Sequence, residues 1–127
     1  MTIMNPSVKE KEGVSDRLSD FTNNPLRPLI EKMAARIAEA YRPEQIILYG
    51  SQATGKARPD SDIDFFIIKQ TNDSFITRCA VIKKMVRDLR GETPFSPIVM
   101  TPEEIQKRLS RGDQFIEEIL QIGIVLI

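Results

Sequence analysis

Two aspartates two residues apart, Asp62 and Asp64, are the residues of this sequence whose type and spacing most clearly indicate chemistry. They open an apolar run, residues 62–68, that is typical of a buried strand. Because alternate side chains of a strand point to the same face, both carboxylates should share one face. Neighbouring carboxylates raise each other's pKa unless a cation lies between them. The pair is therefore a candidate site for a divalent metal; the alternative is a pair of exposed acids that keep a sheet edge soluble.

Ten residues separate this pair from Gly50-Ser51, which follows a second strand-like run, residues 45–49. A glycine lets the backbone turn sharply and approach a ligand closely. The amides of such a turn, together with the serine hydroxyl, can bind phosphate oxygens. The polar residues 52–61 between the motifs are expected to form a loop. The two motifs together predict phosphates held beside metal-binding carboxylates.

The segment from Gly50 to Lys56 also matches most of a P-loop. The next residue is Ala57, however, where a P-loop has the Ser or Thr that binds magnesium. A P-loop also leads directly into a helix, whereas this segment continues through Pro59 toward the second strand. We therefore reject a P-loop.

The elements that must position these motifs follow from the spacing of apolar residues. The predicted helices cover residues 26–41, 74–89 and 113–123, with one more beginning at the capping box of Thr101-Pro-Glu-Glu104. The predicted strands cover residues 45–49, 62–68, 97–100 and 124–127. This order predicts one small α/β (α+β) domain over residues 25–127, preceded by a polar N-terminal arm, residues 1–24. The basic residues of the segment 74–91, Arg78 among them, are interpreted as a solvated helix face, with attraction of an acidic partner or RNA as the alternative.

Composition excludes several classes of function. Eighteen Lys plus Arg balance eighteen Asp plus Glu, which disfavours a protein that binds nucleic acid mainly through charge. With no histidine and one cysteine, histidine-based catalysis and a disulfide within the chain are excluded, and a zinc site nearly so. A metal would be a hard cation held by oxygens, Mg²⁺ or Mn²⁺. No apolar run is long enough for a membrane helix and no signal peptide is visible, so a cytoplasmic protein is expected.

Gly50-Ser51, ten residues and then Asp62-Ile-Asp64 resembles the signature of the nucleotidyltransferase superfamily that includes DNA polymerase beta. The run Asp-Ile-Asp-Phe-Phe-Ile is similar to its minimal nucleotidyltransferases (MNT), and the likeness covers most of residues 26–127. It implies the polymerase beta-like nucleotidyltransferase fold, a small mixed β-sheet flanked by helices. It also implies transfer of a nucleoside monophosphate, AMP from ATP, to a hydroxyl with release of pyrophosphate.

The resemblance also assigns roles to single residues. Gly50 and Ser51 would bind the β- and γ-phosphates of the nucleotide. Asp62 and Asp64 would be the catalytic carboxylates and the ligands of one or two Mg²⁺ (or Mn²⁺) ions. The sequence departs from the family where a third carboxylate is expected on the next strand, because that position holds Ser96. A serine is neither a general base at neutral pH nor a good magnesium ligand.

Minimal nucleotidyltransferases often pair with a small helical protein of the HEPN class, as antitoxin to toxin, and some attach AMP to a tyrosine of that partner. The resemblance therefore implies an antitoxin that modifies a hydroxyl of its partner protein. The alternative is a catalytically impaired, nucleotide-binding antitoxin that neutralises its partner by binding alone. A membrane or nucleic acid partner is not expected, and a second copy of the chain stays open as a further partner.

Overall fold

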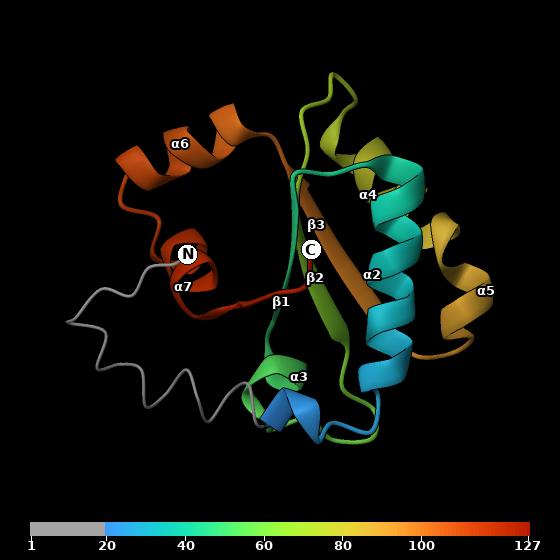
Figure 1. Ribbon diagram of the computed structural model, residues 1–127. Coiled ribbons are helices and arrows are strands. Elements are labelled where there is room, and N and C mark those ends of the chain that lie inside the picture. Colours follow the sequence, from blue (N-terminus) through green and yellow to red (C-terminus); the bar gives the residue numbers. More distant parts are fainter. Residues whose placement is uncertain (1–19) are drawn as a thin grey trace.

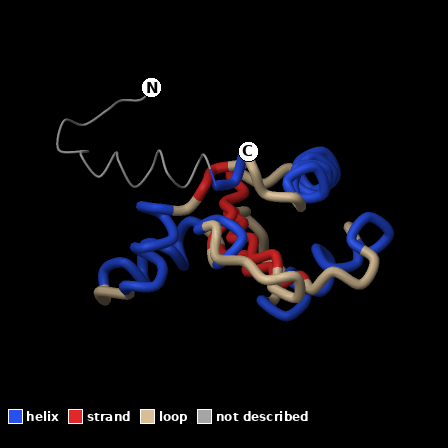
Figure 2. The backbone as a smooth tube through the Cα atoms, turned by 90° about the horizontal axis from the view of Figure 1, so that it is seen from below, coloured by secondary structure: helices blue, strands red, loops and turns tan. Residues whose placement is uncertain are grey.

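A four-stranded mixed sheet forms the centre of the computed structural model, which describes residues 20–127. The strands are β1 (Gln45–Tyr49), β2 (Ile63–Ile68), β3 (Phe95–Met100) and β4 (Ile124–Val125), in the order β3-β2-β1-β4. β1 pairs antiparallel with β2 and β4, and β2 pairs parallel with β3. Figures 1 and 2 show helices on both faces of this sheet. The strands β1 and β2 thus lie in the middle, and β3, which contains Pro97, lies at one edge.

Three helices cover one face of the sheet: α2 (Arg27–Tyr41), α4 (Phe75–Met85) and α5 (Arg87–Arg90) (Figure 1). The buried side chains of α2 are Ile30, Met33, Ala34 and Ile37, which recur at helical spacing. They pack against the alternate side chains of the strands that point to this face, Ile46, Leu48, Ile63, Phe65, Ile67, Phe95 and Val99. The burial of this apolar surface is what fixes the register of the two central strands.

The helices α6 (Pro102–Ser110) and α7 (Gln114–Ile122) lie over the opposite face (Figure 1). Thr101 and Glu104 form the predicted capping box at the start of α6, and the Asp113 side chain caps α7. The core of this face consists of Ile47, Phe66, Met100, Ile105, Ile116 and Ile119. The end of β1 and the short helix that follows it, α3 (Ser51–Thr54), lie beside α7, with which they line a common pocket.

The prediction of one continuous helix over residues 74–89 is wrong, because two helices, α4 and α5, cover this segment. Ser74 caps α4 as predicted, but α4 ends at Met85 because Val86 leaves the helical conformation, with φ −115° and ψ 12°. Val86 is fully buried, so packing against the core sets its backbone. Smaller differences concern the strands. Asp62 precedes β2, β3 begins at Phe95, and the terminal strand is limited to Ile124–Val125.

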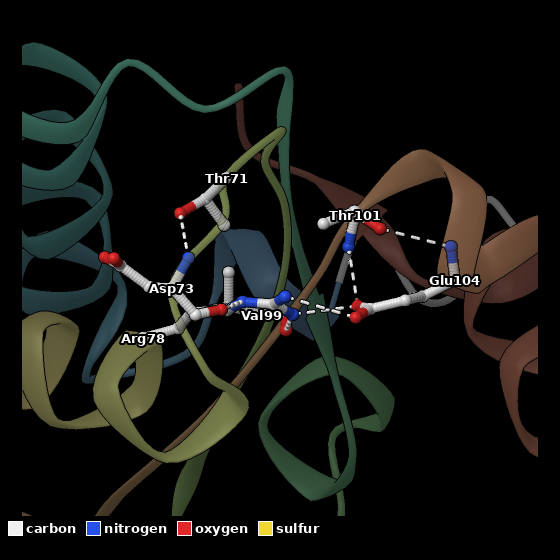
Figure 3. Close-up of polar contacts among 6 residues, drawn as sticks. All are labelled: Thr71, Asp73, Arg78, Val99, Thr101 and Glu104. Atoms are coloured by element: carbon white, nitrogen blue, oxygen red, sulfur yellow. Dashed lines mark hydrogen bonds and ion pairs between the residues drawn. The ribbon is translucent and has the colours of Figure 1, made fainter.

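The interpretation of Arg78 as part of a solvated basic face is also wrong, because its side chain is only 6% exposed. Its guanidinium donates through Nη1 and Nη2 to both carboxylate oxygens of Glu104, over 2.8 and 3.1 Å (Figure 3). It also donates to the carbonyl oxygens of Asp73 and Val99. Glu104 in turn accepts from the backbone N–H of Thr101. This network joins α4, β3 and the start of α6.

The residues just before α2 pack against the domain. Phe21 is buried in the core, and Asn24 donates from Nδ2 to the side-chain oxygen of Gln52 over 2.8 Å. The predicted boundary between residues 24 and 25 stays a prediction, and residues 1–19 of the predicted arm lie outside the described residues. Within residues 20–127, none of the helices combines the length and the apolar character that crossing a membrane requires.

Candidate active site

Gly50 ends β1 in a conformation that favours glycine, with φ 77° and ψ −161°. A Cβ at this position would overlap the carboxylate of Asp64. The backbone of the predicted phosphate-binding turn therefore lies directly against one of the two predicted metal-binding side chains. The two motifs, separated by ten residues in the sequence, meet at one end of the sheet.

The predicted loop over residues 52–61 is partly wrong, because Ser51 begins a short helix, α3. The N–H groups of Ala53 and Thr54 donate to the carbonyl oxygen of Gly50. Gln52 and Ala53 are buried, so their side chains hold the helix against the sheet, whereas the segment from Gly55 to Asp60 is exposed.

Gln52 has a positioning role that the sequence did not indicate. Its buried amide accepts from Asn24 and donates from Nε2 to the carbonyl oxygen of Ser61, over 3.4 Å. Ser61 directly precedes Asp62, so Gln52 links the helix that begins at Ser51 to the residue before the first aspartate. A polar residue within a polar segment gives no sequence signal that it will be buried.

Asp64, Tyr49 and Ser96 lie in one row across three strands. Asp64 pairs with Tyr49 of β1 on one side and with Ser96 of β3 on the other. Paired residues in neighbouring strands point to the same face of the sheet, here the face over which α7 lies. Asp62 lies just before β2, where the hydroxyl of Ser96 donates to its Oδ2 over 2.9 Å. The structure thus brings Asp62, Asp64 and Ser96 together beside Gly50.

The electrostatics of the site are set by burial and by the closeness of the two carboxylates. Partial burial raises the pKa of Asp64 to about 6, and the negative charge of Asp62 contributes to the rise. Burial likewise raises the pKa of the neighbouring Tyr49 hydroxyl to about 12, with a smaller contribution from Asp64. A cation bound between the two aspartates would relieve both the repulsion and the cost of burial.

The donor set fits a magnesium ion that is completed by a substrate. Mg²⁺ is commonly held by one or two carboxylates together with phosphate oxygens and water. Asp62 and Asp64 supply two carboxylates of this kind. No group of three or more His, Cys, Asp or Glu side chains that could enclose a metal occurs among residues 20–127. Two carboxylates of this kind suit an ion whose remaining ligands are phosphate oxygens and water.

Three charged residues close to the motifs in the sequence point to solvent. Lys56 and Arg58 are exposed in the segment after α3. Glu92, which precedes β3, is also exposed and does not share the row of Asp64 and Ser96. Ser96 is instead the β3 residue that lies beside both aspartates.

A model of the family described as polymerase beta, nucleotidyltransferase matches residues 31–127, which is most of the chain. The chain belongs to this nucleotidyltransferase family. The match spans both motifs and the strand of Ser96. The predicted fold class, a small mixed sheet flanked by helices, is confirmed for this nucleotidyltransferase by its four-stranded sheet. The comparison with curated proteins found no match.

Membership establishes nucleotidyl transfer as the general activity of this kind of domain. Nucleotidyltransferase domains generally act on nucleoside triphosphates with a divalent metal. The turn of Gly50 and Ser51 beside Asp62 and Asp64 is the part of this nucleotidyltransferase that suits such a pair of ligands.

Proposed function

We propose that the chain transfers AMP from ATP to a hydroxyl group of a partner protein and releases pyrophosphate. The observation that carries this proposal is the contact between the backbone of Gly50 and the carboxylate of Asp64. It brings a turn suited to phosphate oxygens next to a carboxylate pair suited to a divalent cation. One nucleoside triphosphate can therefore reach both.

In this proposal each residue has one task. Asp62 and Asp64 hold Mg²⁺, or Mn²⁺, and Gly50 and Ser51 bind the β- and γ-phosphates. When bound, the metal neutralises charge that develops on the phosphates and polarises the α-phosphate. The acceptor oxygen bonds to the α-phosphorus, the bond from that phosphorus to the bridging oxygen breaks, and pyrophosphate leaves. The hydroxyl proton passes to solvent water.

The proposed acceptor is presented by another protein. The described domain is small, and its sheet carries only short helices in addition to α2. The residues of its motifs resemble those of the minimal nucleotidyltransferases. For that reason we propose that its partner is a small helical HEPN-type toxin and that the two proteins meet in the cytoplasm. The chain would act as the antitoxin by attaching AMP to a tyrosine hydroxyl of that toxin.

Ser96 favours a second candidate function. Its hydroxyl donates to Asp62 on the strand where the family resemblance leads us to expect a third carboxylate. Without a carboxylate at that position, deprotonation of the acceptor lacks a base. The chain would then bind nucleotide and metal, and neutralise its partner by covering it.

The experiment uses ATP labelled at the α-phosphate, magnesium and an extract of the source cells. The first proposal predicts a labelled protein band that the Asp62→Asn/Asp64→Asn double variant does not produce. Asp60→Asn, in the exposed segment just before the motif, is the control and should label as the wild type does. An absent band with the wild-type chain, together with full neutralisation of the toxin by the double variant, would favour the binding-only antitoxin.

A further inference from the structure

A pocket of about 280 Å³ opens beside the turn of Gly50, between the end of β1, α3 and α7. It is close to the lower end of the range for small-molecule sites, about 300–1,000 Å³, and suits a ligand group of modest size. The residues that line it are Tyr49, Gly50, Ala53, Thr54, Phe115, Glu118, Ile119, Ile122 and Gly123.

The pocket is suited to a neutral ring rather than to phosphate. Its walls are mainly apolar, and the rings of Tyr49 and Phe115 meet edge to face with their centroids 5.8 Å apart. Its lining includes no lysine or arginine, and its one charged member is the anion Glu118. Phosphate oxygens would be repelled by Glu118 and would gain no cationic partner there.

The pocket is continuous with the candidate active site. Gly50 lines the pocket and also lies against the Asp64 carboxylate. Tyr49 lines the pocket and pairs with Asp64 in the neighbouring strand. Neighbouring strands are about 4.8 Å apart, so the pocket begins roughly one strand spacing from the carboxylate pair. A nucleotide with its phosphates at Gly50 and Ser51 would therefore have its other end next to the pocket.

We propose that this pocket holds the base of the nucleoside triphosphate, and that the Glu118 carboxylate selects adenine by accepting a hydrogen bond from its exocyclic amino group. The inference rests on the proposed function, which it extends from a nucleotide to a particular base. A carboxylate is an acceptor only, so it stabilises a base edge that presents a donor. The rings of Tyr49 and Phe115 supply aromatic surface for the purine.

The test compares ATP with purine riboside triphosphate, which lacks only the 6-amino group, by calorimetric titration in the presence of Mg²⁺. A hydrogen bond to a charged group at a partly exposed site predicts a roughly tenfold preference of the wild type for ATP. Glu118→Ala should reduce this preference to about twofold. Glu117→Ala, which removes the same charge from the adjacent exposed position of α7, should keep it. An unchanged preference in Glu118→Ala, or none in the wild type, would overturn the assignment.

A second comparison tests the assignment of the pocket separately from the proposed nucleotide-binding function. Phe115 is 51% exposed, so Phe115→Ala should fold normally, and its thermal unfolding should match the wild type within a few degrees. It should bind ATP several-fold more weakly but inorganic tripolyphosphate with Mg²⁺ as tightly as the wild type. A wild-type chain that binds neither ligand would contradict the nucleotide-binding function and the pocket with it.

The alternative occupant of the pocket is the acceptor side chain of the partner protein. In that case Glu118→Ala and Phe115→Ala would bind ATP and purine riboside triphosphate as the wild type does, while labelling of the partner falls. This result would overturn the assignment of the pocket to the base and leave the proposed transfer intact.

Discussion

Ser96 donates a hydrogen bond to the Oδ2 of Asp62 over 2.9 Å, and it is also the residue paired with Asp64 across β2 and β3. It therefore touches one aspartate of the pair and lies alongside the other. A carboxylate at this position would be the neighbour of both aspartates. A substitution of Ser96 therefore tests whether a third carboxylate increases the rate of transfer.

Ser96→Asp is expected to increase AMP transfer at neutral pH in the presence of Mg²⁺. A positioned general base contributes about 10²–10⁴-fold to a rate, and part of that gain, at least about tenfold, should appear. The measurement is the initial rate of labelling with ATP labelled at the α-phosphate. Ser96→Asn, of similar size but without a charge, is the control. A rate for Ser96→Asp no higher than that of the wild type would show that the third carboxylate does not limit transfer.

Gly50→Ala is expected to abolish transfer. The new Cβ would overlap the Asp64 carboxylate, and the backbone at φ 77° disfavours any residue with a side chain. Gly112→Ala is a matched control, because Gly112 has φ 78° but open space around the position of a Cβ. Both variants should lose about 1–2 kcal/mol of stability from the backbone alone. Only Gly50→Ala should lose labelling activity; equal activity in the two variants would contradict the close approach of Gly50 to Asp64.

Asp64→Asn is expected to stabilise the metal-free protein at pH 7. The pKa of Asp64 is raised to about 6, so its ionised form, which dominates at pH 7, opposes folding. Because this side chain is only partly buried, solvent screening limits the gain to about 1 kcal/mol, or roughly 4 °C in the unfolding temperature. The check is thermal unfolding in EDTA, with Asp60→Asn as the control. A lower unfolding temperature for Asp64→Asn would contradict the cost assigned to this carboxylate.

Adding Mg²⁺ to the same samples should reverse the order of stability. The wild type should gain stability from metal binding, because a ligand that binds only the folded state stabilises it by RT ln(1 + [L]/Kd). Asp64→Asn should gain little, because its affinity for the metal is reduced. Equal responses of the two proteins to Mg²⁺ would place the metal elsewhere.

Glu104→Gln is expected to destabilise the fold at pH 7. Its pKa is lowered, first by the hydrogen bond from Arg78, so the charged form supports folding. Removing one partner of a buried pair costs about 3–5 kcal/mol, but Glu104 is partly exposed, and about 2 kcal/mol is expected. This contribution is present above the ordinary pKa of 4.5 and is lost as the pH falls through the lowered value in the folded state.

The check for Glu104 is urea denaturation of the wild type and the variant at pH 7 and at pH 3. The difference in unfolding free energy should be smaller at pH 3. Glu103→Gln, at the adjacent exposed position of α6, should change little at either pH. A difference that does not shrink toward acid would show that the Arg78 pair is not the source of the effect.

The sequence predicted the parts of the site that depend on local spacing. Gly50, Ser51, Asp62 and Asp64 were singled out because the two motifs occur together at this spacing between two strands, and the structure brings them side by side. Ser96 was found from its position in the third strand, and the register of β2 and β3 places it beside Asp64. The roles proposed for these residues stay predictions.

The parts that the sequence did not predict depend on contacts between distant segments. Arg78 is one of several basic residues in its helix, and only the packing of α4 against β3 and α6 buries it beside Glu104. Gln52 is buried because Asn24 and Ser61 satisfy its amide. The pocket beside Gly50 exists because α7 returns across the sheet to Tyr49, and Phe115 and Glu118 carry no motif that would indicate it.

Pro97 in the edge strand β3 has a consequence for the behaviour of the protein at high concentration. An exposed strand edge is a template onto which the strand of another molecule can add, and such additions lead to aggregates. Proline has no N–H to donate and interrupts the ladder that an incoming strand would need. The carbonyl oxygens of Pro97 and Val99 on this edge are also already bonded, because they accept from Cys79 and Arg78 of α4. This edge of the sheet is thus protected from self-association.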